Sequence, residues 1–340
     1  MFRGLNCRSP KVKAMESDHL LLFLCGKSSA EKDIADSLFS NSNNNGQFQF
    51  SNTNANTSLR LQSHLPRPTN ASFNVDSFFT SLSTRRFGRF LIWSPRLPST
   101  HDVVSQSANV WESPPGCLMF SFTLQMEDGR IVPLVQYIAS LALTEAIKDL
   151  CFNNGLPQLG VKIKWPNDLY LNGLKVGGVL CTSTYKSKKF NISVGIGLNV
   201  DNKQPTTCLN ARLQQIASMS CQLRKEDILA SFFNKFENFF DQFLSQGFKP
   251  LEELYYQTWL HSGQRVIVQD TREGQIVDNA ATIQGLTSSG YLLAIGDDGQ
   301  MCELHPDGNR SFQGFLLSFR GEAWDEFAHL TGNGPNPDSI

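Results

Sequence analysis

The chain carries the stretch Lys164-Trp165-Pro166-Asn167-Asp168-Leu169-Tyr170, which is followed closely by Lys175 and by the pair Gly177-Gly178. Apolar runs flank it, so Val161 to Trp165 predicts a strand and Val176 to Thr184 predicts its hairpin partner. From such a hairpin, the ammonium groups of Lys164 and Lys175 would converge on one anionic group. Preorganised cations of this kind stabilise the charge that develops when a phosphate reacts.

Each of these residues also has an ordinary explanation when it is taken alone. A single Lys in a strand is usually solvated, because Lys is almost never fully buried. Gly177-Gly178 would most often indicate a bulge or a tight crossing. The segment Gly195-Ile196-Gly197-Leu198-Asn199, at the end of a later predicted strand, is a weak phosphate signal by itself. In this order and spacing, however, the residues form a rare combination.

The combination resembles the signature of biotin–protein ligases, and the sequence around it is similar to that of plant holocarboxylase synthetases. The resemblance implies a ligase that uses ATP, biotin and Mg²⁺ and attaches biotin to a carrier-protein lysine through biotinyl-5′-AMP. Lys164 and Lys175 are the candidates for stabilising the charge on the phosphate, and by this resemblance Lys175 contacts the biotin carboxylate and the adenylate phosphate. Asp168 matches a residue of the adenylate pocket, where it would orient Lys164 or accept a hydrogen bond from the incoming lysine.

The same resemblance assigns binding roles to further residues. Asn167 would hold the local geometry, and Asn199 matches a position that faces the nucleotide. Gly177 and Gly178 would permit close approach of the backbone to the ligand.

Two more blocks of sequence match the family. Leu97 to Asp102 contains Ser99 and Thr100, a pair that binds the ureido ring of biotin in the family; hydroxyls suit that ring because they both donate and accept. Either hydroxyl can also cap a helix that begins at His101. We group His101 with the cofactor-binding residues and not with the catalytic ones. In the block Asn109 to Pro114, Trp111 corresponds to an aromatic that packs beside the adenylate.

A piece of the family pattern is absent between these two blocks. The family carries there a strand and a Gly-Arg-Gly-Arg loop that closes over biotinyl-adenylate, whereas no Gly-Arg-Gly-Arg occurs in these 340 residues. We therefore expect an internal deletion near residues 106–109. Losing a strand exposes the edge of its neighbour, and losing the arginines removes a bidentate phosphate clamp. Impaired ligase activity is the expected consequence.

The remaining sequence predicts the domain organisation. Ser40 to Ser58 is dominated by Asn and Ser, so residues 1–83 predict a disordered leader or linker, with one strand at Leu20 to Cys25. We expect a catalytic domain over 84–248, a small β domain over 249–309 and a divergent tail over 310–340.

Periodicity predicts the main elements of the two folded domains. Cys117 to Met126 alternates as a half-buried strand does, and Phe190 to Val200 predicts another. The spacing of apolar residues predicts helices over Val135 to Leu150 and Glu226 to Leu244. Four short strands are predicted at 265–269, 280–284, 291–295 and 301–304. With the resemblance, the expected fold is α+β: a mixed, mainly antiparallel sheet with helices, as in the class II synthetase-like biotin/lipoate ligase fold, plus a small C-terminal SH3-like β-barrel.

Composition limits the partners and the compartment. A formal net charge of -1 argues against bulk attraction to nucleic acid or to a membrane surface. The eight Cys lack metal-ligand spacing, so no metal site is predicted. The segment before Glu16 is basic and free of acids, as in a transit peptide, and a start at Met1 or at Met15 would give a chloroplast or a cytoplasmic form.

The implied protein partners are the biotin carboxyl carrier domains of acetyl-CoA carboxylase and of other carboxylases. Two alternatives stay open: a lipoate or octanoyl ligase, which shares the catalytic architecture, and a catalytically weak regulatory isoform that binds carrier proteins. The Trp-Pro-Asn-Asp string and the C-terminal β module favour biotin, and the missing loop favours the regulatory isoform. The sequence leaves the oligomeric state undetermined.

Overall fold

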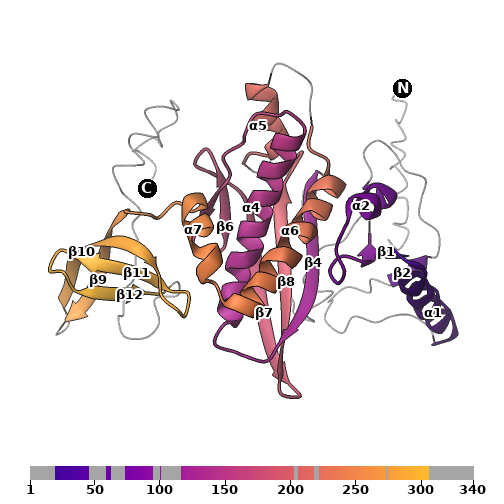
Figure 1. Cartoon of the computed structure of the whole chain (residues 1–340), viewed down its shortest axis with the longest axis horizontal. Coiled ribbons are helices and arrows are strands. Elements are labelled where there is room, and N and C mark those ends of the chain that lie inside the picture. Colours follow the sequence, from indigo (N-terminus) through magenta and orange to yellow (C-terminus); the bar gives the residue numbers. More distant parts are fainter. Residues whose placement is uncertain are drawn as a thin grey trace, which may run out of the picture. The chain divides into compact units, whose positions relative to one another are not determined.

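A computed structural model describes residues 20–45, 59–62, 73–94, 100, 116–202, 206–217, 222–272 and 275–305 (Figure 1). The chain divides into two compact units. The smaller unit comprises Met1–Asn70 with Phe90–Leu97, and the larger comprises Ala71–Arg89 with Pro98–Ile340.

The smaller unit contains a three-stranded sheet and one helix. Strand β1 (Leu20–Gly26) pairs in parallel with β2 (Leu59–Gln62) and antiparallel with β3 (Phe90–Trp93). Helix α1 (Ser29–Asn45) begins at a side-chain cap, in which the Ser28 N–H donates to the Glu31 carboxylate at 2.7 Å. The predicted strand at Leu20 to Cys25 is confirmed. The expectation of a leader without further structure is not met, because this cap and the packing of α1 on β1 support a helix that reaches into the Asn-rich segment.

The larger unit is built on a five-stranded sheet in the order β4-β8-β7-β6-β5, in which every neighbouring pair is antiparallel. Its strands are β4 (Cys117–Met126), β5 (Lys162–Lys164), β6 (Asp168–Leu171), β7 (Leu174–Lys186) and β8 (Lys189–Asn199). The predicted strand over Cys117 to Met126 and the mainly antiparallel α+β class are confirmed.

Helices cover one face of this sheet, as Figure 1 shows. Helix α4 (Val135–Asn153) follows the short η1 (Val132–Leu134), and α6 (Lys225–Gln246) packs beside it; both predicted helices are confirmed. Helix α2 (Val75–Ser81) packs on α6, and α5 (Leu209–Ile216) follows β8 along the chain. Aromatic rings from strand and helix interlock in the core, as at Phe120–Phe232 (5.0 Å between ring centroids) and Phe122–Phe236 (4.9 Å).

A second, four-stranded antiparallel sheet follows in the order β12-β11-β10-β9. Its strands are β9 (Arg265–Arg272), β10 (Gln275–Leu286), β11 (Leu292–Gly296) and β12 (Met301–Leu304), which confirms the four predicted strands. The small β domain was expected to begin at residue 249, where α7 (Lys249–Thr258) begins. This helix packs on α4 and α6, and the first strand of the second sheet begins at Arg265. Among the described helices, none combines the length and the apolar character needed to cross a membrane.

Candidate active site

The stretch Lys164 to Tyr170 forms a hairpin between β5 and β6. Residues Trp165 to Asn167 make its turn, and the Trp165–Pro166 peptide bond is cis. The predicted pairing of Val161–Trp165 with Val176–Thr184 is therefore wrong, because β6 lies between β5 and β7. The sequence contained a signal for β6 in Asn172-Gly173: both residues have positive φ (49° and 77°), and such a pair favours a tight hairpin turn.

A register shift between β6 and β7 decides which side chains share a face. Leu169 pairs with Gly177, but Tyr170 pairs with Lys175, so Val176 is an extra residue in β7. Such a bulge reorients the side chains that follow it. Val176 is fully buried, while Lys175 lies on the same face of the sheet as Asp168 and Tyr170, opposite the helices.

On this open face, Lys175 and Asp168 form an ion pair with 2.5 Å between Nζ and Oδ1. The side chains stay accessible, with exposed fractions of 44% and 30%. Lys164 pairs in register with Asp168, and its ammonium lies 5.4 Å from the centre of the Tyr170 ring. The carboxylate that was expected to orient Lys164 thus contacts Lys175.

Tyr170 is a residue of this face that the sequence analysis did not single out. Burial raises the pKa of its phenol, and the charge of Asp168 raises it further, against an opposing effect of Lys175. The phenol therefore stays neutral at physiological pH and presents an aromatic ring to the Lys164 ammonium.

Glycines leave the middle of the open face without side chains. Gly178 pairs with Gly197, and Gly195 lies between Leu180 and Ser121 on its two neighbouring strands. The strip of bare backbone allows a ligand to approach the sheet closely.

Gly177 serves a different purpose from its neighbour. A Cβ atom at Gly177 would lie 2.6 Å from the backbone oxygen of Gly197, whereas a Cβ at Gly178 would first meet Asp168 Oδ1 at 3.2 Å. Gly177 is therefore required by the packing of β7 on β8, and Gly178 borders the ion pair. Both were predicted to admit a ligand, and only Gly178 lies on the open face.

Two further predicted residues, Thr100 and Asn199, lie on or beside this face. The Thr100 hydroxyl lies 2.8 Å from the Ser121 hydroxyl, and Ser121 projects from the open face of β4. Asn199 ends β8 on the same face as Gly195 and Gly197. Ser99, His101 and Trp111, as well as the expected deletion near 106–109, lie outside the described residues.

The turn of the hairpin is held from two directions. The Asn167 carbonyl accepts a hydrogen bond from the Val179 N–H at 2.8 Å, so Asn167 holds the local geometry through its backbone. Trp165 is buried and donates its backbone N–H to His261 Nε2 at 3.0 Å and its indole N–H to the Tyr137 hydroxyl at 2.9 Å. No sequence pattern distinguished His261 or Tyr137, because their partners are far away along the chain.

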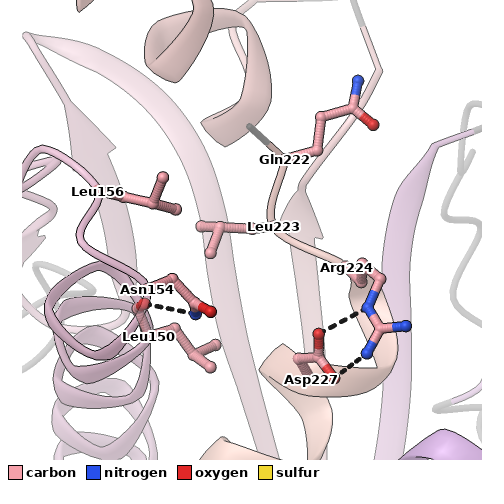
Figure 2. Close-up of a pocket in the computed structure, with 7 residues that line it drawn as sticks. All are labelled: Leu150, Asn154, Leu156, Gln222, Leu223, Arg224 and Asp227. Carbon is pink, nitrogen blue, oxygen red and sulfur yellow. Dashed lines mark hydrogen bonds and ion pairs between the residues drawn. The ribbon is translucent and has the colours of Figure 1, made fainter. Parts of the chain in front are cut away.

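A cavity of about 330 Å³ lies at the helical side of the unit, where α4 ends and α6 begins (Figure 2). Leu150, Leu156 and Leu223 line it, and the Arg224 guanidinium at its rim is bonded to the Asp227 carboxylate at 2.8 Å. This cavity contains none of the predicted site residues. We therefore place the candidate site on the open face, where the predicted lysines, Asp168 and the glycines meet.

The described residues contain no group of three or more His, Cys, Asp and Glu side chains arranged to hold a metal ion. The polar groups of the open face are instead ammonium, carboxylate, hydroxyl and amide groups. Such a set suits a ligand that combines an anionic group with hydrogen-bonding edges.

Comparison with known sequences identifies relatives over most of the chain. Residues 87–199 match the Biotin/lipoate A/B protein ligase family, and residues 261–309 match the Biotin protein ligase C terminal domain. Biotin–protein ligase 1, chloroplastic, of Arabidopsis thaliana is 60% identical over 324 residues, which cover 88% of this chain and 87% of the relative. Biotin–protein ligase 2 of the same plant is 60% identical over 85% of this chain and 94% of its own length.

A crystal structure of the biotin protein ligase from Aquifex aeolicus aligns with 61% of this chain and 90% of its own chain, with a TM-score of 0.45 and 22% identity.

The two sequence relatives, together with the match to a biotin-specific C-terminal domain, favour biotin over lipoate. The chain therefore belongs to the biotin–protein ligase family, whose members use ATP and Mg²⁺ to attach biotin to carrier proteins.

Proposed function

We propose that the open face of the five-stranded sheet is the site where biotin is adenylated and transferred. The observation that carries this proposal is the accessible Lys175–Asp168 pair beside the strip formed by Gly178, Gly195 and Gly197. A cation next to bare backbone can meet a phosphate at contact distance, because no side chain intervenes.

In the first step, a carboxylate oxygen of biotin bonds to the α-phosphorus of ATP and pyrophosphate leaves. Lys175 and Lys164 stabilise the charge on the phosphate, and Asn199 faces the nucleotide. Thr100 lies beside Ser121 of the edge strand β4, and we place the ureido ring of biotin there. Ser99, His101 and Trp111 complete the proposed binding set.

In the second step, the amine of the carrier lysine attacks the acyl carbon of biotinyl-adenylate and AMP leaves. Lys175 moves toward the phosphate when the adenylate is present. Asp168 is then released from its ion pair and accepts a hydrogen bond from the incoming amine. The Asp168 carboxylate thus pairs with Lys175 before the reaction and with the amine of the target lysine during it.

Biotin-dependent ATP–pyrophosphate exchange, with circular dichroism on the same sample, tests this assignment. We expect folded protein to catalyse exchange, and we expect Lys175→Gln to lower the rate by about 100-fold while the spectrum is unchanged. Exchange at the original rate in Lys175→Gln would contradict the proposed site.

We also propose that an internal deletion near residues 106–109 weakens the ligase activity of this chain. In support, the 324 aligned positions exceed 88% of a 340-residue chain, so the chloroplastic relative has residues within the aligned region that this chain lacks. Without the Gly-Arg-Gly-Arg loop to close over it, biotinyl-adenylate is exposed to hydrolysis by water. Inserting the Gly-Arg-Gly-Arg segment at this position should raise transfer to a carrier domain by at least about 10-fold. Equal transfer rates with and without the insertion would contradict the deletion proposal.

The same observation favours a second candidate function, a regulatory isoform that binds carrier proteins and modifies them slowly. A pull-down with an apo carrier domain separates the two functions. Retention of the carrier without biotin transfer would support the regulatory function, and multiple turnover would exclude it.

For partners and compartment, we propose carrier domains of acetyl-CoA carboxylase and other carboxylases, and a chloroplast or cytoplasmic address. The name of the first relative, which is chloroplastic, supports the plastid address, and the basic segment before Glu16 is consistent with it. Fusing a fluorescent protein to chains that start at Met1 or at Met15 would test the dependence on the start. Identical distribution of the two fusions would contradict it.

A further inference from the structure

The buried junction between the β5–β6 turn and the second sheet contains a histidine whose two ring nitrogens both lie at hydrogen-bond distance from other residues. His261 is 2% exposed. Its Nε2 accepts the Trp165 backbone N–H at 3.0 Å, and its Nδ1 lies 2.7 Å from Gln264 Oε1. Because Gln264 offers an oxygen to Nδ1, the proton of the neutral imidazole is on Nδ1, and Nε2 carries the lone pair that accepts the Trp165 N–H.

Other contacts of the junction leave this turn little freedom. The Leu260 N–H donates to the Ile163 carbonyl at 2.9 Å, and the Trp165 indole N–H contacts both the Tyr137 hydroxyl and the Gly290 carbonyl. The hydrogen-bonded path continues from Gln264 to Ile283 of β10. The turn that carries Lys164 and Asp168 is therefore connected to the second sheet through His261.

The environment keeps the imidazole neutral. Burial lowers the pKa of His261 below its ordinary value of 6.5; the hydrogen bond to Gln264 opposes that effect, and the charge of Lys164 on β5 adds to it. The nearby phenols of Tyr137 on α4 and Tyr255 on α7 have raised pKa values because they are buried, so they are neutral as well. A protonated imidazole would place a second cation beside Lys164 and would have no lone pair for the Trp165 N–H.

We propose that His261 is a positioning residue, which holds the Lys164–Asp168 turn in its reactive geometry by accepting the backbone N–H of Trp165. The inference rests on the proposed function of the open face. Uptake of a proton by His261 turns this acceptor into a donor, the turn loses its anchor, and the lysine and carboxylate on either side of it lose their alignment. Activation of biotin should therefore decline on the acid side as His261 becomes protonated.

Three variants and one control of the full chain test this role by ATP–pyrophosphate exchange as a function of pH. His261→Phe removes the acceptor and should reduce exchange about 10-fold at neutral pH. His261→Gln keeps an acceptor oxygen that does not titrate, so it should restore most of the rate and abolish the acid limb. Gln264→Glu places a carboxylate beside Nδ1 and should move the acid limb up by about one pH unit. The control, His305→Gln, alters a partly exposed histidine that directly follows β12 of the second sheet and should leave the profile unchanged.

A second readout does not depend on turnover. Amide hydrogen exchange at Trp165, corrected for intrinsic rates, should lose about 10-fold of its protection in His261→Phe, whereas amides of β8 such as Val194 keep theirs. If all chains lack pyrophosphate exchange, the proposed function fails, and the Trp165 amide still decides whether His261 holds the turn. An acid limb that persists in His261→Gln, or Trp165 protection that survives in His261→Phe, overturns the proposal. Should His261→Phe fail to fold, His261→Gln and Gln264→Glu decide through the pH profile alone.

Discussion

The two faces of the five-stranded sheet use the same strands for opposite purposes. The covered face is filled by aromatic rings, as where Phe120 meets Phe232 and Phe122 meets Phe236. The open face has glycines in its middle and the accessible Lys175–Asp168 pair at one side. Alternation along a strand makes this division possible, since neighbouring residues point to opposite faces.

The division breaks at one position, and that break assembles the candidate site. If β7 alternated strictly, Lys175 would share a face with Gly177, which pairs with the buried Leu169. The extra residue, Val176, lets Lys175 join Gly178 on the open face. Mutations on the covered face should therefore change stability, and mutations on the open face should change biotin activation. Only mutations at the bulge should change both.

The largest expected effect belongs to the covered face. Phe236→Ala removes a fully buried ring that packs against Phe122 and Phe232, and should lower the free energy of unfolding by about 3–5 kcal/mol. Urea unfolding followed by circular dichroism measures this loss. Biotin affinity per folded molecule should be unchanged, and a proportional loss of affinity would show that the two faces are not independent.

The reciprocal change on the open face should affect activation and leave stability nearly intact. Lys175→Ala should lower pyrophosphate exchange by about 100-fold, since it removes a cation from the reacting phosphate. The free energy of unfolding should change by less than about 1 kcal/mol, because the ion pair is exposed to solvent. Lys186→Gln, at the exposed end of the same strand, is the matched control, and a comparable loss of exchange in that variant would contradict the assignment.

Substitution of the adjacent Gly177 and Gly178 should separate loss of stability from loss of biotin activation. Gly177→Ala forces a Cβ against the Gly197 carbonyl and should cost about 2 kcal/mol of stability by urea unfolding. A Cβ at Gly178 would be nearest to the Asp168 carboxylate, at a tight 3.2 Å from a side chain that can shift, and would meet the Asn167 carbonyl at 3.6 Å. Gly178→Ala should therefore cost less in stability and more in biotin-dependent exchange. Equal losses of stability in the two variants would contradict this division.

The smallest expected effect is a pH dependence at the edge of the covered face. Glu237 accepts the backbone N–H groups of Arg85, Arg86 and Phe87 at 2.7–3.2 Å. Burial alone would raise the pKa of Glu237, but these three hydrogen bonds and the charge of Arg86 lower it below the ordinary value of 4.5. The unfolded chain therefore takes up a proton before the folded chain does. The stabilisation is complete above about pH 5 and is lost as the pH falls through the lowered pKa.

Glu237→Gln should accordingly cost about 1 kcal/mol at pH 7 and less at pH 4, as measured by urea unfolding at both values. Glu253→Gln, at an exposed position of α7, serves as the control. A loss that does not depend on pH would indicate that packing, and not the charge, holds the segment at Glu237.

The sequence predicted the regular elements where the periodic signal was long. The alternation over Cys117 to Met126 and the apolar spacing in α4 and α6 predicted elements that the structure contains. It did not predict β6, because four residues are too few for periodicity to show, although Asn172-Gly173 marked the turn that follows them. Nor did it predict α1 beside the Asn-rich segment, since a local cap and packing on β1 outweigh poor helix propensity there.

By itself, the sequence determined the family and the kinds of residue that we propose for the site. Lysines, an aspartate and glycines in a rare order identify these features without any knowledge of distance. Only the tertiary structure decided which of them meet: Asp168 with Lys175 through a bulge, Thr100 with Ser121, and the Trp165 N–H with His261 from a distant part of the chain. Such pairings depend on strand register and on contacts between residues far apart along the chain, and neither is encoded in any local pattern.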